Sequence, residues 1–221
     1  MRVRFHAAFA LIALTVGGAC DAPPTVRTTE ASPADSVTIR ARQDSIVRSR
    51  PGYVIDSILP VEEEIRRFRA TLGTAPQGLS GGERSRAALI DAFLRSLEQR
   101  DTTGLWGLVV NRPEFGFLIY PTSPNARPPY RQSPELVWLQ RSAASDKGAR
   151  RLLARFAGRP LGHRGVTCPT AGSVEGNNVI WSGCAVRLVS PETGAMSSLR
   201  LFGPIVQRGR TFKFLSLSNG L

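Results

Sequence analysis

The stretch that decides the fold is residues 162–189, GHRGVTCPTAGSVEGNNVIWSGCAVRLV, because it is typical of two strands on either side of a turn. Val, Ile and Trp favour strands, and they occur in the two flanks, Gly162–Thr170 and Asn178–Val189. Glycine and asparagine favour turns, and they occur between the flanks at residues 175–178, EGNN. We therefore expect an antiparallel hairpin whose turn is centred on Gly176.

Two cysteines occupy matching positions in this hairpin. Cys168 and Cys184 are equally far from Gly176 along the chain, so they face each other on neighbouring strands. Because we also expect the chain to be exported to an oxidising compartment, this even pair predicts a disulfide. No C-x-x-C motif and no cluster of His or carboxylate residues accompanies the cysteines, so no metal site is expected.

Two further strands follow the hairpin. Strand-like segments at Met196–Gln207 and Arg210–Ser218 are joined by turns at residues 192–194, ETG, and at residues 208–209, RG. Three hairpin turns in series predict a four-stranded antiparallel meander.

A helix with a clear apolar stripe precedes the strands. Its apolar residues recur at helical spacing at Ala87, Leu89, Ile90, Phe93, Leu94 and Leu97. The preceding residues 79–86, LSGGERSR, resemble the signature loop of ATP-binding-cassette ATPases, but the chain has no G-x-x-x-x-G-K-[ST] loop for a nucleotide. We therefore interpret Ser80 and Glu83 as a capping box that begins the helix.

Three more elements are predicted between this helix and the meander. Asp101 caps a short helix, and the apolar run Phe115–Tyr120 predicts a strand. Residues 133–135, SPE, predict the start of a longer helix that ends at Gly158 and breaks at residues 146–148, DKG.

This order of elements resembles the nuclear transport factor 2-like superfamily, with its SnoaL-like and cystatin-type α+β relatives, over about residues 83–221. The residues that carry the likeness are the Ala87–Leu97 helix, the Leu105–Val109 turn with Trp106, and the strand aromatics Trp181, Phe202, Phe212 and Phe214. The resemblance implies a cone-shaped α+β fold, with helices packed in the concave face of a strongly curved, mostly antiparallel sheet. The cavity of that fold is an enzyme pocket in some members and a binding or dimerisation surface in others, so the fold leaves the function open.

The first residues are typical of an export signal. Arg2 and Arg4 precede an apolar run that is too short to span a membrane and that ends in small residues before Cys20. This arrangement resembles the lipobox of bacterial lipoproteins, which implies removal of residues 1–19 and acylation of Cys20. An ordinary secreted protein cut near Ala19, or an uncleaved anchor, is the alternative.

The sequence predicts four regions. They are a lipoprotein signal peptide over residues 1–19, a flexible tether over residues 20–34, a helical N-terminal segment over residues 35–78 and an α+β domain over residues 79–221. Within the helical segment we expect one helix from Ser36 to Arg50 and a second that begins near Pro60. The expected location is extracytoplasmic, on the periplasmic side of a bacterial membrane that holds the N-terminal lipid.

The formal net charge is +12, and the basic surplus lies in the C-terminal half. From Arg127 onward, fourteen Arg and Lys residues stand against four acidic residues. The densest basic patch comprises Arg141, Lys147, Arg150, Arg151, Arg155 and Arg159. Such a patch could attract anionic lipid headgroups or envelope glycans, but we favour the simpler interpretation that these arginines form a solvated surface. Nucleic acid is not expected as a partner outside the cytoplasm.

Candidates for catalysis are few. His163 is the one histidine after the signal segment, and Asp91 and Tyr120 are candidate partners, but no spacing argument brings the three together. A solvent-facing histidine at the end of a strand is the alternative. The serines are scattered through polar turns, so no nucleophile is predicted among them, and no cofactor is expected.

The sequence therefore favours a lipid-anchored, non-catalytic binding module with an apolar pocket for a small apolar or anionic ligand, or for an envelope component. Two other classes stay open. One is a pocket enzyme of the isomerase or hydrolase type that uses His163, and the other is a scaffold or assembly protein that forms a homodimer.

Overall fold

The computed structural model describes residues 33–51 and 59–221. The expected signal peptide at residues 1–19, the acylation site Cys20 and nearly all of the expected tether at residues 20–34 lie outside these ranges. Within the described ranges, no helix combines the length and the apolar character needed to cross a membrane.

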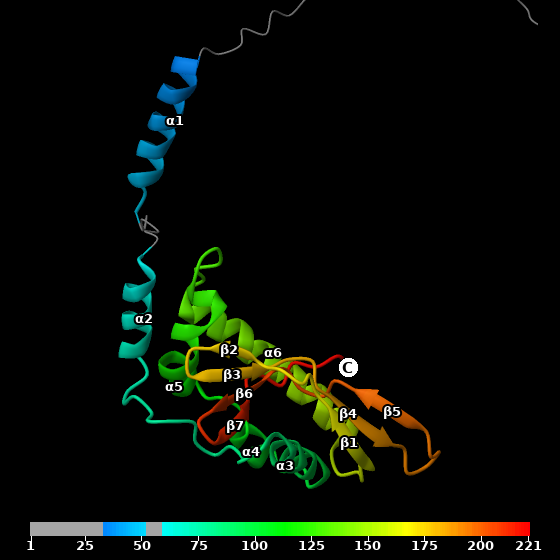
Figure 1. Cartoon of the computed structure of the whole chain (residues 1–221). Coiled ribbons are helices and arrows are strands. Elements are labelled where there is room, and N and C mark those ends of the chain that lie inside the picture. Colours follow the sequence, from blue (N-terminus) through cyan, green and yellow to red (C-terminus); the bar gives the residue numbers. More distant parts are fainter. Residues whose placement is uncertain (1–32, 52–58) are drawn as a thin grey trace, which may run out of the picture. The chain divides into compact units, whose positions relative to one another are not determined.

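The chain divides into two units, residues 1–56 and 57–221, so the helical segment expected at residues 35–78 contributes to both. The described part of the first unit contains α1 (Pro33–Arg48), drawn in blue in Figure 1. This helix begins three residues before the expected start at Ser36, and it is exposed along residues 37–48.

The second unit is an α+β structure, as expected. Its helical elements are α2 (Val61–Ala70), α3 (Arg86–Glu98), α4 (Thr102–Gly107), α5 (Arg112–Glu114), the π-helix η1 (Phe115–Ile119), the 3₁₀ turns η2 (Tyr120–Thr122) and η3 (Pro124–Ala126), and α6 (Pro134–Phe156). Its strands are β1 (His163–Thr167), β2 (Ser173–Glu175), β3 (Asn178–Trp181), β4 (Ala185–Val189), β5 (Met196–Leu199), β6 (Ile205–Arg208) and β7 (Thr211–Phe214). They form two antiparallel sheets, ordered β2-β3-β6-β7 and β1-β4-β5.

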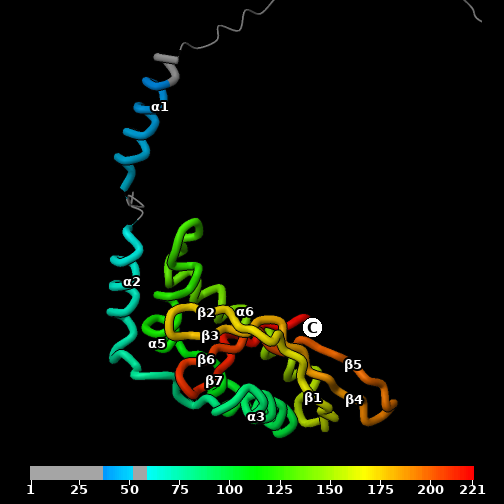
Figure 2. The backbone as a smooth tube through the Cα atoms, viewed as in Figure 1, coloured from blue at the N-terminus to red at the C-terminus, as the bar shows by residue number. Residues whose placement is uncertain are grey.

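The two sheets are halves of one meander. The expected strand Asn178–Val189 is interrupted after Trp181, so that β3 belongs to one sheet and β4 to the other. The expected strand Met196–Gln207 is divided in the same way into β5 and β6. The predicted turns at Gly176 and at residues 208–209 join β2 to β3 and β6 to β7. The strand order is therefore as expected, but the strands change sheet midway, a path that can be followed in Figure 2.

The expected disulfide joins Cys168 and Cys184, whose Cα atoms are 4.2 Å apart. Thr167 of β1 pairs with Ala185 of β4, so the cysteines are the next pair in the same register. Beyond them, β2 and β3 pair in a register shifted by one residue. The disulfide thus lies where the chain passes from one sheet to the other.

The inner strands β3 and β6 of the four-stranded sheet contain adjacent residues that are both buried, whereas Val174 of the edge strand β2 is 75% exposed. Successive strand residues point to opposite sides, so the two faces of β3 and β6 belong to different core clusters. One face packs against α3 and belongs to a core cluster that includes Trp181, Ile205 and Phe214. The other face packs against α2, η1 and α6 through a second cluster that includes Ile180, Val206 and Leu215. Five residues of the stripe predicted on α3 lie in the first cluster, where Leu89, Ile90, Phe93, Leu94 and Leu97 are at most 4% exposed. Ala87, also predicted for this stripe, is exposed.

Side-chain caps begin α4 and α6 as expected. Asp101 Oδ1 accepts a hydrogen bond from Gly104 N over 2.8 Å, and Ser133 Oγ accepts one from Leu136 N over 3.2 Å. The break expected at residues 146–148 is wrong, because α6 runs without interruption from Pro134 to Phe156.

The capping box expected from Ser80 and Glu83 is wrong. The cap of α3 is Ser85, whose Oγ accepts a hydrogen bond from Ala88 N over 3.1 Å. Glu83 instead exchanges both of its backbone hydrogen bonds with Phe212 of β7. A tertiary pairing therefore fixes the loop that sequence alone assigned to the helix start.

Ser80 belongs to a buried ion pair that joins its loop to α5 and β7. Lys213 Nζ lies 2.9 Å from Glu114 Oε2, and the side chains are 3% and 1% exposed. Lys213 also donates to the carbonyl oxygen of Ser80 over 2.6 Å, and the Ser80 hydroxyl and amide donate to Glu114. The pair therefore connects three segments of the chain, and removal of either partner would leave the other as a buried charge without compensation.

The strand expected at Phe115–Tyr120 is wrong, because the run is the π-helix η1 and the start of η2. Asn111 and Glu114 form a capping box that begins this helical segment. Arg69 of α2 donates to the carbonyl oxygen of Gly116 over 3.1 Å, which links α2 to this helical segment.

Candidate functional site

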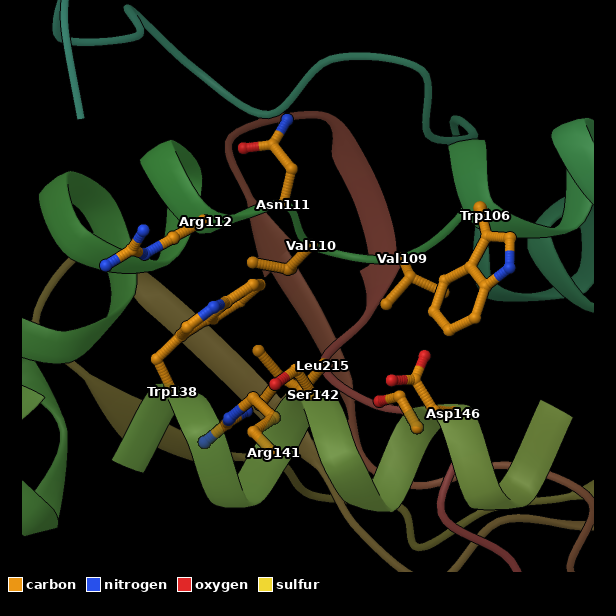
Figure 3. Close-up of a pocket in the computed structure, with 11 residues that line it drawn as sticks. Trp106, Val109, Val110, Asn111, Arg112, Trp138, Arg141, Ser142, Asp146 and Leu215 are labelled. Carbon is orange, nitrogen blue, oxygen red and sulfur yellow. The ribbon is translucent and has the colours of Figure 1, made fainter. Parts of the chain in front are cut away.

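A cavity of about 360 Å³ lies between α6 and the segment that joins α4 to α5 (Figure 3). Its apolar lining comes from Trp106, Val109, Val110, Trp138 and Leu215. Its polar lining comes from Asn111, Arg112, Arg141, Ser142, Ser145 and Asp146. In Figure 3 the two tryptophans lie toward opposite ends of this space, which we call the tryptophan cavity.

The phase of α6 explains which of its residues line the tryptophan cavity. Trp138, Arg141, Ser142 and Ser145 follow the spacing i, i+3, i+4 and i+7, which places them on one face of the helix. The Trp138 ring is held by Phe115, with the ring centroids 5.4 Å apart. One wall of the cavity is therefore a regular helix face with a packed aromatic anchor.

Among the charged groups that line this cavity, Arg141 is the one best placed to bind an anionic group of a ligand. Its side chain is half-buried, with the guanidinium carbon 5.4 Å from the centroid of Phe115. Among the described residues it forms no ion pair within 4.0 Å. Burial lowers the pKa of Arg141, and the charge of Glu175 opposes that shift. A cation that has lost part of its hydration favours an anionic group from a ligand.

The other charged residues of the tryptophan cavity are differently placed. Arg112 is already paired, because its Nη2 lies 2.7 Å from Glu135 Oε2. Asp146 is exposed, and Figure 3 shows it beneath Trp106. Arg141 is therefore the stronger candidate for an anion-binding residue.

A second cavity, of about 660 Å³, lies between the start of α3 and β1 with the segment that follows β1. We call it the histidine cavity, since His163 and Asp91 both line it. His163 Nδ1 lies 3.5 Å from Asp91 Oδ1. The fold thus brings together two of the three catalytic candidates that the sequence could not connect. Ser85, Arg86 and the disulfide residue Cys168 line the same cavity.

Tyr120, the third candidate, lies elsewhere. Its side chain is fully buried in the core cluster on the other face of the four-stranded sheet, 5.6 Å from Phe115 between ring centroids. Its hydroxyl donates to the carbonyl oxygen of Gln132. Burial, with a smaller contribution from Glu64, raises the pKa of Tyr120 to about 12. Tyr120 is therefore a neutral core residue and does not meet His163.

The residues of the expected basic patch do not form one uniform group. Lys147, Arg150, Arg151 and Arg155 are exposed on the C-terminal half of α6, and Arg159 is exposed just beyond it. Arg141 differs, because it is half-buried at the tryptophan cavity.

Over residues 33–51 and 59–221, no group of three or more His, Cys, Asp or Glu residues could hold a metal ion. The chain matches no protein-family model, no curated protein and no solved structure.

The tryptophan cavity and the role of Arg86 as a lining residue were not predicted from the sequence. The sequence did contain a sign of this cavity. An aromatic residue, a cation and two hydroxyls share one face of α6, at Trp138, Arg141, Ser142 and Ser145. No comparable signal marked Arg86, since its proximity to His163 depends on how α3 packs against β1.

Proposed function

We propose that this protein is a non-catalytic binding module whose tryptophan cavity holds a small apolar ligand with an anionic group. The observation that carries the proposal is Arg141, a half-buried cation with no ion pair among the described residues, in a cavity with two tryptophan walls. Aromatic surfaces bind apolar bodies, and a guanidinium binds carboxylate, sulfonate or phosphate groups.

The size and chemistry of the cavity support a small ligand. Its volume of about 360 Å³ lies near the lower end of the range of roughly 300–1,000 Å³ that is common for ligand sites. Most ligand sites combine an apolar lining with a few convergent polar groups, as this cavity does. On the same wall the Ser142 hydroxyl donates to the carbonyl oxygen of Leu139, and the Ser145 hydroxyl accepts from Leu217 N. Arg141 is therefore the group that would orient an anionic end of the ligand.

The binding proposal is tested with anilinonaphthalene sulfonate, a fluorescent probe that has an aromatic body and one anionic group. The full chain in detergent should show saturable binding, and Arg141→Gln should weaken it about tenfold through loss of a charge-assisted bond. Arg150→Gln is the matched control, because it removes an exposed arginine from the same helix. Unsaturable binding, or equal binding by the two variants, would contradict the proposal.

We further propose that the module is anchored to a bacterial membrane, on its extracytoplasmic side, through acylated Cys20. The support is the order of Arg2, Arg4, an apolar run, small residues and Cys20 in the sequence. Mass spectrometry of the N-terminal peptide from membranes should find the chain beginning at an acylated cysteine. Cys20→Ala should move the protein to the soluble fraction, and retention in the membrane would contradict the anchor.

We also propose that the second unit is a variant of the nuclear transport factor 2-like fold. The order of α3, α4, α6 and a terminal meander supports this assignment, as does the abrupt change of sheet within the long strands. The helical run at Phe115–Ile119 departs from the expected layout. An experimental structure would test the assignment, and a different connectivity of the strands would contradict it.

A pocket enzyme that uses His163 is a second candidate function, and the 3.5 Å approach of His163 Nδ1 to Asp91 Oδ1 favours it. A carboxylate at one ring nitrogen orients the imidazole so that the other nitrogen can accept a proton. If an isomerase or hydrolase activity is found, His163→Gln should abolish it and Arg164→Gln, at the next and exposed position, should not. Full activity in His163→Gln would remove this mechanism.

A further inference from the structure

Two residues that line the histidine cavity, and a tryptophan stacked against one of them, carry buried polar side-chain atoms that the protein does not pair. Among the described residues, five buried side-chain nitrogen or oxygen atoms lack a hydrogen-bond partner, and three of them are Arg86 Nη1, His163 Nε2 and Trp181 Nε1. A buried polar atom without a partner is costly, so such atoms in native proteins commonly mark the place of an ion or water molecule.

The three residues belong to one corner of the fold. Arg86 and His163 both line the histidine cavity. The guanidinium carbon of Arg86 lies 4.7 Å from the centroid of the Trp181 ring. Trp181 is 9% exposed, so this stacking holds the arginine against a fixed core residue. These three residues therefore belong to one local group, whereas the other two unpaired atoms, Arg112 Nε and Ser123 Oγ, lie outside the histidine cavity.

The chemistry of the group favours an oxyanion. The guanidinium of Arg86 and the indole N–H of Trp181 can only donate. Because Asp91 faces Nδ1 of His163, Nε2 donates when both ring nitrogens carry a proton. Oxygen atoms of a carboxylate or phosphate group accept from all of these donors, and a guanidinium is well suited to both.

The charges around the cavity point the same way. A Cβ added to Gly165, a lining residue, would lie 2.9 Å from the guanidinium of Arg187, so a second arginine lies beside this part of the cavity. The cavity also opens at the N-terminus of the thirteen-residue helix α3, where the positive end of the helix dipole lies. Asp91 is the one acidic residue among the lining, and it lies beside His163 Nδ1, at the opposite ring nitrogen from Nε2.

We propose that the histidine cavity is a binding site for an oxyanion, a carboxylate or phosphate group, held by Arg86 with His163 and Trp181 as further donors. This site is separate from the tryptophan cavity, and the inference stands whether or not that cavity binds a ligand. A free ion and the anionic end of a larger molecule present the same chemistry to these three residues.

The test follows the NMR signal of the His163 side chain while the full chain in detergent is titrated with sodium phosphate, sodium acetate or sodium chloride at one ionic strength. The chain has two histidines, His6 and His163, so His163→Gln assigns the signal. A saturable shift with phosphate or acetate that chloride does not produce is the expected result. Whichever oxyanion binds more tightly identifies the preferred group.

Arg86→Gln should weaken this binding about tenfold or more, since a bond to a charged donor is lost. Arg84→Gln is the matched control, because it removes an exposed arginine two positions earlier and leaves the cavity lining unchanged. Trp181→Phe, which keeps an aromatic ring and removes only the N–H donor, should weaken binding less than Arg86→Gln. If Arg86→Gln fails to fold, the affinity of Trp181→Phe for the oxyanion tests the proposal instead.

Three results would overturn the proposal. One is the absence of a saturable shift with both phosphate and acetate. Another is an equal response to chloride, which would indicate screening of charge alone. The last is unchanged affinity in folded Arg86→Gln, or in Trp181→Phe where Arg86→Gln is unfolded.

Discussion

Lys213 and Arg141 are both cations withdrawn from solvent, but of the two only Lys213 has an ion-pair partner among the described residues. Lys213 is buried against Glu114, and Ser80 supplies further hydrogen bonds to the pair. Arg141 lies over an aromatic ring at a cavity and forms no ion pair among the described residues. A buried cation that is paired with a carboxylate connects parts of the fold. A half-buried cation without an ion-pair partner can instead bind an anionic group of a ligand.

Of the substitutions that test this comparison, we expect Lys213→Met to lower the free energy of unfolding most. The variant leaves the Glu114 carboxylate buried without a counter-charge, which should lower the free energy of unfolding by about 3–5 kcal/mol. Urea unfolding of the full chain measures the loss. Lys147→Met, at an exposed position of α6, is the control and should change the free energy by less than about 0.5 kcal/mol. A loss below about 1 kcal/mol in Lys213→Met would show that the pair is not what holds this region.

Ser80→Ala should have a smaller effect on the same pair. It removes the hydroxyl that donates to Glu114 over 3.1 Å but keeps the backbone amide that donates over 2.7 Å. We expect the free energy of unfolding to fall by about 1–2 kcal/mol in urea unfolding. Ser198→Ala, on an exposed position of β5, should be nearly neutral. If the two serine variants behave alike, the hydroxyl contributes nothing to the pair.

Tyr120 adds a buried neutral group to the comparison, and its effect depends on pH. Because its pKa is about 12 in the folded protein and its ordinary value is 10, the unfolded chain loses the phenolic proton first as the pH rises. The stability that this shift contributes is complete below pH 10 and is lost between about pH 10 and 12. Thermal unfolding across this range should be less pH-dependent in Tyr120→Phe than in the native chain. Tyr130→Phe, at an exposed tyrosine, should retain the native dependence.

The smallest effect on stability is expected for Arg141→Gln. Since no ion pair is broken, the free energy of unfolding should change by about 0.5 kcal/mol or less. Urea unfolding beside Lys213→Met gives the direct comparison. A loss as large as that of Lys213→Met would mean that Arg141 serves the fold, and the distinction between the two cations would fail.

Local signals predicted the parts of the fold that depend on short-range chemistry. Asp101 and Ser133 cap their helices, and the cysteine positions around Gly176 give the strand register of the disulfide. Each of these features depends on residues that are close in sequence or that lie symmetrically about one turn. The apolar spacing of α3 likewise predicted its buried face.

Features that depend on distant partners were not predictable in this way. The apolar run Phe115–Tyr120 is compatible with a buried strand or a buried helix, and the capping box of Asn111 and Glu114 was the one nearby sign of a helix. Gly148 suggested a break in α6, but a Cβ at this position would collide with the carbonyl oxygen of Leu217, so the glycine permits close packing. The approach of His163 to Asp91 also arises only when β1 packs beside α3.

Because β3 and β6 bury adjacent residues on both faces of their sheet, they should tolerate fewer polar substitutions than β4. In β4, buried Val186 and Leu188 flank exposed Arg187, so a saturation library should accept polar residues at every second position. In β3, Ile180 and Trp181 are consecutive and both buried, and the neighbouring strand β6 repeats this arrangement. Polar substitutions should therefore be selected against at adjacent positions there, and two halves of one meander should differ in how freely their sequences diverge.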